Sequence, residues 1–165
     1  MKDDGFPKLT QTQVESDNLA PEAWQTLLDY LKKRGGDSAT IVRFLPQHWR
    51  AVYTTFWLDC EVNNGGHHQF FWNSDGALNG ETLQDLAYIG AEPYVVIFRD
   101  ALNIYASHNY QEEKRSSGNT WQAFTQGYRE KRLEDCDKRF YQEKKTLPAY
   151  LAEHIRRNVK IYCGQ

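Results

Sequence analysis

Three features of this amino-acid sequence predict an all-α fold. Apolar residues recur at three- and four-residue spacing along most of the chain, and the alternation typical of strands is almost absent. Prolines at positions 21, 46, 93 and 148 precede apolar runs as first-turn prolines do, and glycines follow several of those runs. With 165 residues, 40% of them hydrophobic, the chain can bury a substantial core in one domain. We therefore predict a single compact multi-helix domain.

The first 45 residues are predicted to form an arm, a helix and a connection. Residues 1–17 are polar and show no periodicity, which predicts an N-terminal arm and places the helical domain at 18–165. The first helix starts near Pro21 and ends before Gly35, and its apolar positions are Trp24, Leu27, Leu28 and Leu31. A short apolar piece, 41–45, leads to the next helix.

A long helix is predicted to follow Pro46. Its apolar stripe contains Trp49, Val52, Tyr53, Phe56 and Cys60. Ala51 and Leu58 fall on the opposite side, so we expect this helix to be covered on more than one face, either as the centre of the fold or at a dimer contact. The glycine pair at 65–66 ends it, because glycine adopts left-handed backbone angles without strain.

Five further helical segments complete the prediction. Most begin at a capping asparagine or threonine or at a first-turn proline, and they carry apolar residues at helical spacing. Gly76 and Gly90 mark two of the helix ends, and a polar loop is expected at 111–119. The predicted segments are 67–73, 79–89, 93–105, 121–140 with a break, and 146–159.

Charged residues are strongly segregated along the chain. Residues 51–98 contain no lysine or arginine but hold six carboxylates. Residues 1–113 carry sixteen carboxylates and eight cations, whereas residues 114–165 carry six and twelve, although the formal net charge of the chain is only −2. A folded protein of this kind presents a strongly negative face, and such a face attracts basic partners. The charge pattern therefore favours a binding protein over a catalyst.

The sequence also indicates where the protein acts. Its three cysteines, Cys60, Cys136 and Cys163, are odd in number and lack the CxxC spacing of a zinc site, which is typical of a reducing compartment. The N-terminal residues lack the apolar stretch of a signal peptide, and no apolar run is long enough to cross a bilayer. We therefore expect a cytoplasmic protein that does not bind membranes.

The most distinctive pattern is a motif in the middle of the chain. Residues 61–73 read EVNNGGHHQFFWN, and IGA follows at 89–91, before the helix that starts at Pro93. This combination resembles the bacterial DNA-mimic protein family, over about residues 46–105. One departure is His67, where that family usually has an aromatic or apolar residue.

The polar residues of this motif are expected to stabilise the fold. Gln69 and Asn73 are four residues apart and share a helix face, and Glu61 could reach them across the glycine pair. The favoured interpretation is a buried polar network that fixes the angle between two helices around the EVNNGG reversal. The residues assigned to this scaffold are Glu61, Asn64, Gly65, Gly66, Gln69, Phe71 and Asn73.

Catalytic and metal sites find little support in the sequence. The histidines at 67–68, with Glu61 and Asp59 nearby, suggest a metal-dependent hydrolase, but adjacent histidines on a helix point about 100° apart. No HExxH spacing and no phosphate-binding glycine loop is present. Cys60 falls on an apolar stripe, which favours an inert core thiol. We therefore predict a protein that is not an enzyme and that needs no cofactor or metal.

Carboxylates in and near the cation-free stretch are the candidate binding residues. Glu81 and Asp85 lie four residues apart on one helix face, about 5–6 Å from each other. That spacing is of the same order as the distance between phosphates on one DNA strand, which carries roughly one charge per 3.4 Å of axis. The predicted contact set is Asp59, Asp75, Glu81, Asp85, Glu92, Glu112 and Glu113.

The family resemblance implies a function for this surface. A protein of this family presents carboxylates where DNA presents phosphates, and it occupies the DNA-binding surface of a basic protein. The expected partner is a helix-turn-helix transcription regulator, which the mimic keeps off DNA. Since such regulators are usually dimers, a dimeric mimic would suit the spacing of their half-sites. The alternative is an immunity-type protein that neutralises a basic toxin such as a nuclease.

The basic C-terminal third is expected to be a solvated, salt-bridged face. Its cations are mixed with carboxylates, mostly at helical pairing distances. Charge runs of this kind are usual on exposed helix faces, so we expect no direct contact with nucleic acid. Contact with the acidic face of a second copy is the alternative for these residues.

Overall fold

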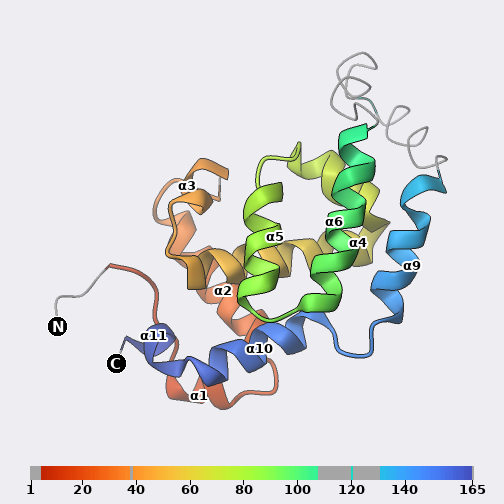
Figure 1. Cartoon of the computed structure of the whole chain (residues 1–165). Helices are drawn as coiled ribbons and strands as arrows, with labels where there is room; N and C mark the ends of the chain where they lie inside the picture. Colours follow the sequence, from red (N-terminus) through yellow and green to blue (C-terminus); the bar gives the residue numbers. More distant parts are fainter. Residues whose placement is uncertain (1–4, 38, 108–119, 121–130, 165) are drawn as a thin grey trace.

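Helices account for all the regular secondary structure in the described part of the chain. The computed structural model describes residues 5–37, 39–107, 120 and 131–164, and within these ranges it contains α-helices and one 3-10 helix but no strand (Figure 1). The prediction of an all-α fold is confirmed. The elements are α1 (Gln11–Glu15), α2 (Leu19–Lys32), α3 (Ala39–Arg43), α4 (Gln47–Ser74), α5 (Asn79–Tyr88), α6 (Glu92–Ser107), η1 (Lys131–Leu133), α9 (Glu134–Gln142), α10 (Leu147–Arg157) and α11 (Val159–Cys163).

Helix α4 is the centre of the fold. Helices α2, α5, α9 and α10 all pack against it, and Figure 1 shows it crossing the molecule between them. Trp49 and Val52 on its predicted apolar stripe are fully buried, and so are Ala51 and Leu58 on the opposite side of the helix. The expectation that this helix is covered on more than one face is therefore met by its neighbours within the chain.

The glycine pair divides α4 into two helical segments. Gly65 has φ −161°, and Gly66 has φ 71° with ψ 179°, so neither residue is helical and the helix kinks there. Gly66 requires glycine, because its φ is positive and an added Cβ would lie 2.5 Å from Asp137 Oδ2. Helical structure resumes at once after the pair, so the EVNNGG sequence makes a kink in a long element and not the reversal that the sequence predicted.

The N-terminal segment is not the loose arm expected from the sequence. Residues 11–15 form α1, which starts with a capping box: Thr10 Oγ1 accepts the backbone N–H of Gln13, and the Gln13 side chain accepts the backbone N–H of Thr10. Leu9 and Val14 are buried in the core. The sequence did not reveal this helix or its buried residues, because a five-residue helix is too short to show a periodic apolar pattern.

The two ends of the described chain lie side by side (Figure 1). The backbone N–H of Leu9 donates to the carbonyl oxygen of Tyr162 at 2.9 Å, and Arg156 donates to the carbonyl oxygen of Ser16 at 2.8 Å. Tyr162 is fully buried, and its hydroxyl donates to the carbonyl oxygen of His48 at 3.1 Å. These contacts hold α1, α10 and α11 against the start of α4.

Other helix ends follow their predicted signals. Helix α5 starts at Asn79 and is followed by Gly90, which has φ 76°. Helix α10 starts after Thr146, whose hydroxyl oxygen accepts the backbone N–H of Ala149. The first half of the helix predicted at 121–140 falls on residues that the structure does not describe, as does the predicted loop before it, whereas 131–140 form η1 and most of α9.

No helix of the described ranges combines the length and apolar character that crossing a membrane requires.

Candidate functional site

The motif residues meet in one polar network across the kink. Glu61 Oε2 accepts hydrogen bonds from the side-chain amide of Gln69 at 2.9 Å and from that of Asn73 at 2.7 Å. Glu61 is only 8% exposed, and the two amide donors compensate its buried carboxylate. Because these side chains come from both segments of α4, the network fixes the angle between them. Of the other motif residues, Phe71 is buried in the core and Asn64 is exposed.

A second contact fastens α9 to the kink. Asp137 Oδ1 accepts the backbone N–H of His67 at 2.8 Å and lies 2.7 Å from Nδ1 of the same histidine. The imidazole is fully buried, and the ring centroids of Phe71, Phe98 and Phe140 lie 6.5, 6.4 and 5.7 Å from its own. A neutral ring with its proton on Nδ1 satisfies the contact with Asp137. His67 thus belongs to an aromatic cluster, which suits a position that is aromatic or apolar in the family it resembles.

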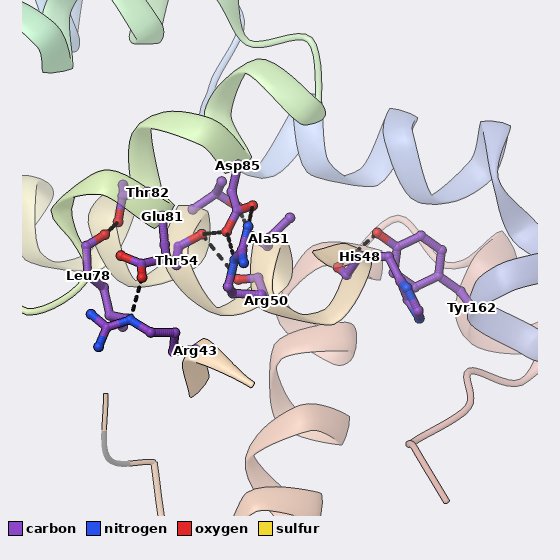
Figure 2. A network of polar contacts seen from close by, with 11 residues as sticks. Arg43, His48, Arg50, Ala51, Thr54, Leu78, Glu81, Thr82, Asp85 and Tyr162 are labelled. Atoms are coloured by element: carbon purple, nitrogen blue, oxygen red, sulfur yellow. Dashed lines mark hydrogen bonds and ion pairs between the residues drawn. The ribbon is translucent and has the colours of Figure 1, made fainter. Parts of the chain in front are cut away.

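Asp85 is buried, whereas the sequence predicted an exposed contact residue. Figure 2 shows its carboxylate between α4 and α5, where Arg50 donates to both oxygens at 2.8 and 2.9 Å and the Thr54 hydroxyl donates at 3.0 Å. Asp85 is 0% exposed, and its hydrogen bond raises the pKa of Arg50. The charge of Asp85 is therefore neutralised inside the protein, because the fold turns this face of α5 onto Arg50.

Glu81, one turn earlier on α5, is partly exposed and also paired. Arg43 donates to its carboxylate (Figure 2) and to the backbone carbonyl of Ala77. The Glu81 side chain is 19% exposed and that of Arg43 is 48% exposed. Burial opposes ionisation of Glu81, but the hydrogen bond and the charge of Arg43 hold its pKa below the usual value. Glu81 therefore stays ionised at the surface beside a cation from α3.

Asp59 lies on another side of α4. Burial raises the pKa of Asp59 to about 6. Burial, and then the charge of Asp59, raise the pKa of Tyr94 on α6, whose hydroxyl donates to the carbonyl oxygen of Lys145. Asp59 is therefore near α6 and the start of α10, whereas Glu81 pairs with Arg43 on α3. The structure does not bring these two carboxylates into one row.

Two other predicted contact residues are exposed at the two ends of α5. Asp75 follows the last residue of α4, and Glu92 opens α6. Helix α5 between them has ten residues and is about 15 Å long. Glu112 and Glu113 lie outside the described residues. The structure adds Asp37, an exposed carboxylate that sequence reasoning missed because it stands outside the cation-free stretch.

The described residues contain neither a group of side chains arranged to bind a metal ion nor an activated thiol at Cys60. No three His, Cys, Asp or Glu side chains are grouped there to hold a metal ion. Cys60 is exposed, which corrects the prediction of a core thiol, because burial on this face of α4 falls from Trp49 through half-buried Phe56 to Cys60. Although the residue is exposed, partial burial of its thiol group, and then the charges of Asp59 and Glu61, raise the pKa of Cys60, which disfavours a reactive thiolate.

Comparison with known protein families identifies the chain. A family model described as "DMP19-like protein" matches residues 43–158, which is more than half of the sequence. The chain belongs to the DMP19-like protein family. This confirms the resemblance to DNA-mimic proteins carried by the EVNNGG and QFFWN motifs. No curated protein and no solved structure matches the chain.

The family match covers the features that distinguish this DMP19-like protein. Residues 43–158 include α4, α5, α6, α9 and α10, and therefore the kink, both polar contacts that hold it and the Arg50–Asp85 pair. Helices α1 and α2 precede the matched range. The surface carboxylates at the ends of α5 also fall inside it.

Several C-terminal cations of the DMP19-like protein are engaged in ion pairs. Lys138 lies 3.0 Å from Glu134, and Arg139 lies 2.7 Å from Asp100 on α6. Lys145 and Arg157 both pair with Glu153. These contacts agree with a salt-bridged face and leave fewer cations available for nucleic acid than the sequence count suggests.

Proposed function

We propose that this DMP19-like protein is a DNA mimic that binds a basic DNA-binding protein, a helix-turn-helix transcription regulator, and keeps that regulator off its DNA. The observation that carries the proposal is the stretch 51–98, which lacks cations and whose surface carboxylates flank and line α5. Membership of the family supports it, since the family is named for DNA mimics and is not a known family of enzymes.

The contact surface in this proposal consists of Asp75, Glu81 and Glu92. Asp75 precedes and Glu92 follows α5, which is about 15 Å long. At roughly 3.4 Å of axis per base pair, this span corresponds to about four base pairs of one DNA strand. Asp85 is excluded because it is buried against Arg50. Asp59, on another side of α4, and the pair 112–113 remain predicted contacts.

Charge complementarity would make this binding fast and sensitive to salt. The basic DNA-binding surface of a regulator is attracted over a distance of about 8 Å at physiological ionic strength, and this attraction weakens as salt is added. A surface selected to bind DNA phosphates also accepts carboxylates, because arginine forms bidentate hydrogen bonds with both groups.

The test uses two variants that change the net charge equally. Asp75→Asn/Glu92→Lys alters the proposed surface, and asparagine suits position 75 because φ there is 50°. Asp135→Asn/Glu134→Lys makes the same change on α9, where both side chains are exposed. Each protein is used to capture partners from a lysate of the source cells at low salt, followed by elution in a salt gradient and mass spectrometry.

Wild type and the α9 control should both retain one basic helix-turn-helix protein, displaced by its operator DNA, and the α5 variant should lose it. Far-UV circular dichroism should show the same helicity and melting for all three proteins. Retention of the regulator by the α5 variant would contradict the proposed surface. Recovery of a nuclease instead of a regulator would replace mimicry by the immunity-type function.

A further inference from the structure

A pocket opens beside the proposed contact surface. It has a volume of about 160 Å³ and lies between α4, the start of α5 and the connection from α2 to α3. Three of its lining residues are aromatic, and several others carry oxygen atoms. The residues that decide its chemistry are Asp37, Tyr53, Thr54, Trp57, Phe70 and Thr82.

Three of the hydroxyl groups in this lining can offer only lone pairs to a ligand. Tyr53 donates its proton to Asp37 Oδ2 at 3.1 Å, Thr54 donates to Asp85 at 3.0 Å, and Thr82 donates to a backbone carbonyl at 2.8 Å. A hydroxyl has a single proton, so each of these oxygens is left as an acceptor, and the carboxylate of Asp37 is an acceptor only. This part of the lining therefore favours a ligand that donates hydrogen bonds.

Charge and aromatic surface favour a cation among such donors. Asp37 is exposed and contributes a negative charge to the pocket. Tyr53 and Trp57 stack on one another, with ring centroids 6.2 Å apart and planes at 13°. Faces of tryptophan and tyrosine attract cations.

Size and shape distinguish arginine from lysine. An engineered protein cavity of about 150 Å³ holds a benzene molecule, so a pocket of about 160 Å³ has room for a planar guanidinium and part of its methylene stem. A guanidinium stacks on an aromatic ring and presents five donors in a rigid fork, whereas an ammonium is a compact, strongly hydrated point charge. Trp57 and the surrounding acceptors suit the guanidinium.

We propose that this pocket binds the guanidinium group of an arginine side chain supplied by the partner protein, with Asp37 accepting its hydrogen bonds and Trp57 stacking on its plane. The source of the arginine rests on the proposed function, because proteins that bind DNA use arginine to contact phosphates. Recognition of the guanidinium group itself does not depend on that function, so the two can be tested separately.

The first experiment needs no partner. The intact protein is titrated with Nα-acetyl-arginine amide while the indole N–H signals are followed by NMR, and Nα-acetyl-citrulline amide, which is neutral and nearly isosteric, is the control ligand. The arginine compound should shift the Trp57 signal with a Kd of about 1 mM. The citrulline compound should bind about tenfold more weakly, since it lacks the charge. Equal binding of the two compounds, or no shift of Trp57, would overturn the proposal.

Two variants locate the binding group. Asp37→Asn removes the charge but keeps an acceptor for Tyr53. It should raise the Kd of the arginine compound about fivefold or more. Asp29→Asn is the matched control, because Asp29 is an exposed carboxylate on α2 that does not line the pocket. It should leave the affinity unchanged. The proposal is overturned if the two variants bind the arginine compound equally well.

The same variants separate this pocket from the proposed function. In the lysate capture, Asp37→Asn should retain less of the partner than Asp29→Asn. If Asp37→Asn retains the partner fully while Asp75→Asn/Glu92→Lys loses it, the result supports DNA mimicry and contradicts the arginine pocket. If the arginine compound binds but no basic protein is captured, the result supports guanidinium binding in the pocket and contradicts the proposed function.

Discussion

Two carboxylates one helical turn apart, Glu81 and Asp85, have opposite environments. Glu81 is partly exposed and ionised beside Arg43, whereas Asp85 is fully buried between Arg50 and Thr54. The sequence made them look alike, because their spacing places both on one helix face. The positions of Arg43 and Arg50 in the fold decide which of the two carboxylates is available to a partner. No local sequence pattern predicts those positions.

Asp85 should therefore matter for stability and Glu81 should not. Asp85→Ala leaves Arg50, whose side chain is 15% exposed, without its partner, and should lower the free energy of unfolding by about 3–5 kcal/mol. Glu81→Ala should cost less than about 1 kcal/mol, because its partner is half exposed and remains hydrated. Urea unfolding followed by circular dichroism measures both. Equal losses would show that Asp85 is not held as a buried ion pair.

Asp59 should make stability depend on pH. Its pKa is raised by burial from 3.8 to about 6, so the folded state binds this proton more tightly than the unfolded state. The contribution of Asp59 to the stability of the folded state is therefore favourable below about pH 4 and becomes unfavourable as pH rises through 6. The free energy of unfolding of Asp59→Asn should exceed that of wild type by about 1–2 kcal/mol at neutral pH, allowing for the partial exposure of Asp59. At pH 4 the two free energies of unfolding should be equal. A difference that does not change with pH would contradict this assignment.

Among the elements, helix starts and stops were the features that sequence predicted best. First-turn prolines, the capping threonine at 146 and Gly90 stand at element boundaries, and the glycines at 65–66 stand at the kink of α4. Each of these residues acts through local backbone geometry. Helix α1 was missed because it is short and its anchors are distant in the sequence: Leu9 and Val14 are buried, and their backbone groups form hydrogen bonds with Tyr162 and Arg156. A break at the glycine pair was predicted, but as a reversal between helices and not as a kink in one long helix. The attachment of this kink to Asp137 spans 70 residues and has no local signal.

The kink should tolerate no side chain at its second glycine. In Gly66→Ala the residue would keep a positive φ of 71°, and its Cβ would lie 2.5 Å from Asp137 Oδ2, the carboxylate that holds His67. We expect a loss of about 3 kcal/mol or more in the free energy of unfolding. Gly80→Ala, in the first turn of α5 with no atom within 4 Å of its added Cβ, should be neutral or stabilising by up to about 1 kcal/mol. Similar unfolding curves for the two variants would show that the backbone at 66 adapts.

At the scale of the whole molecule, folding redistributes the charge that the sequence segregates. Arg43 and Arg50 fold onto the cation-free stretch and pair with two of its six carboxylates, while several C-terminal cations pair with their own neighbours. The existence of an acidic surface could be predicted from the count of charges, but its extent could not, because long-range ion pairs reduce it. The exposed carboxylates around α5 are Asp75 and Glu92, with the partly exposed Glu81.

This sparse surface leads to a prediction about competition with DNA. Double-stranded DNA releases condensed counterions when a protein neutralises its phosphates, so log K falls by about 0.9 for each phosphate contact per tenfold rise in salt. The few surface carboxylates around α5 hold no comparable counterion layer, and salt acts on them only by screening. The Kd of the mimic–regulator complex should therefore rise less steeply with salt than that of the operator–regulator complex.

Raising NaCl from about 50 to about 200 mM should thus shift a fixed amount of regulator from labelled operator DNA to the DMP19-like protein, as measured by fluorescence anisotropy. Asp75→Asn/Glu92→Lys should displace no operator at either concentration, and the equally charged Asp135→Asn/Glu134→Lys should behave as wild type. Parallel salt dependences for the two complexes would mean that the protein surface releases as many ions as DNA does. The contact would then have to include many more carboxylates than those around α5.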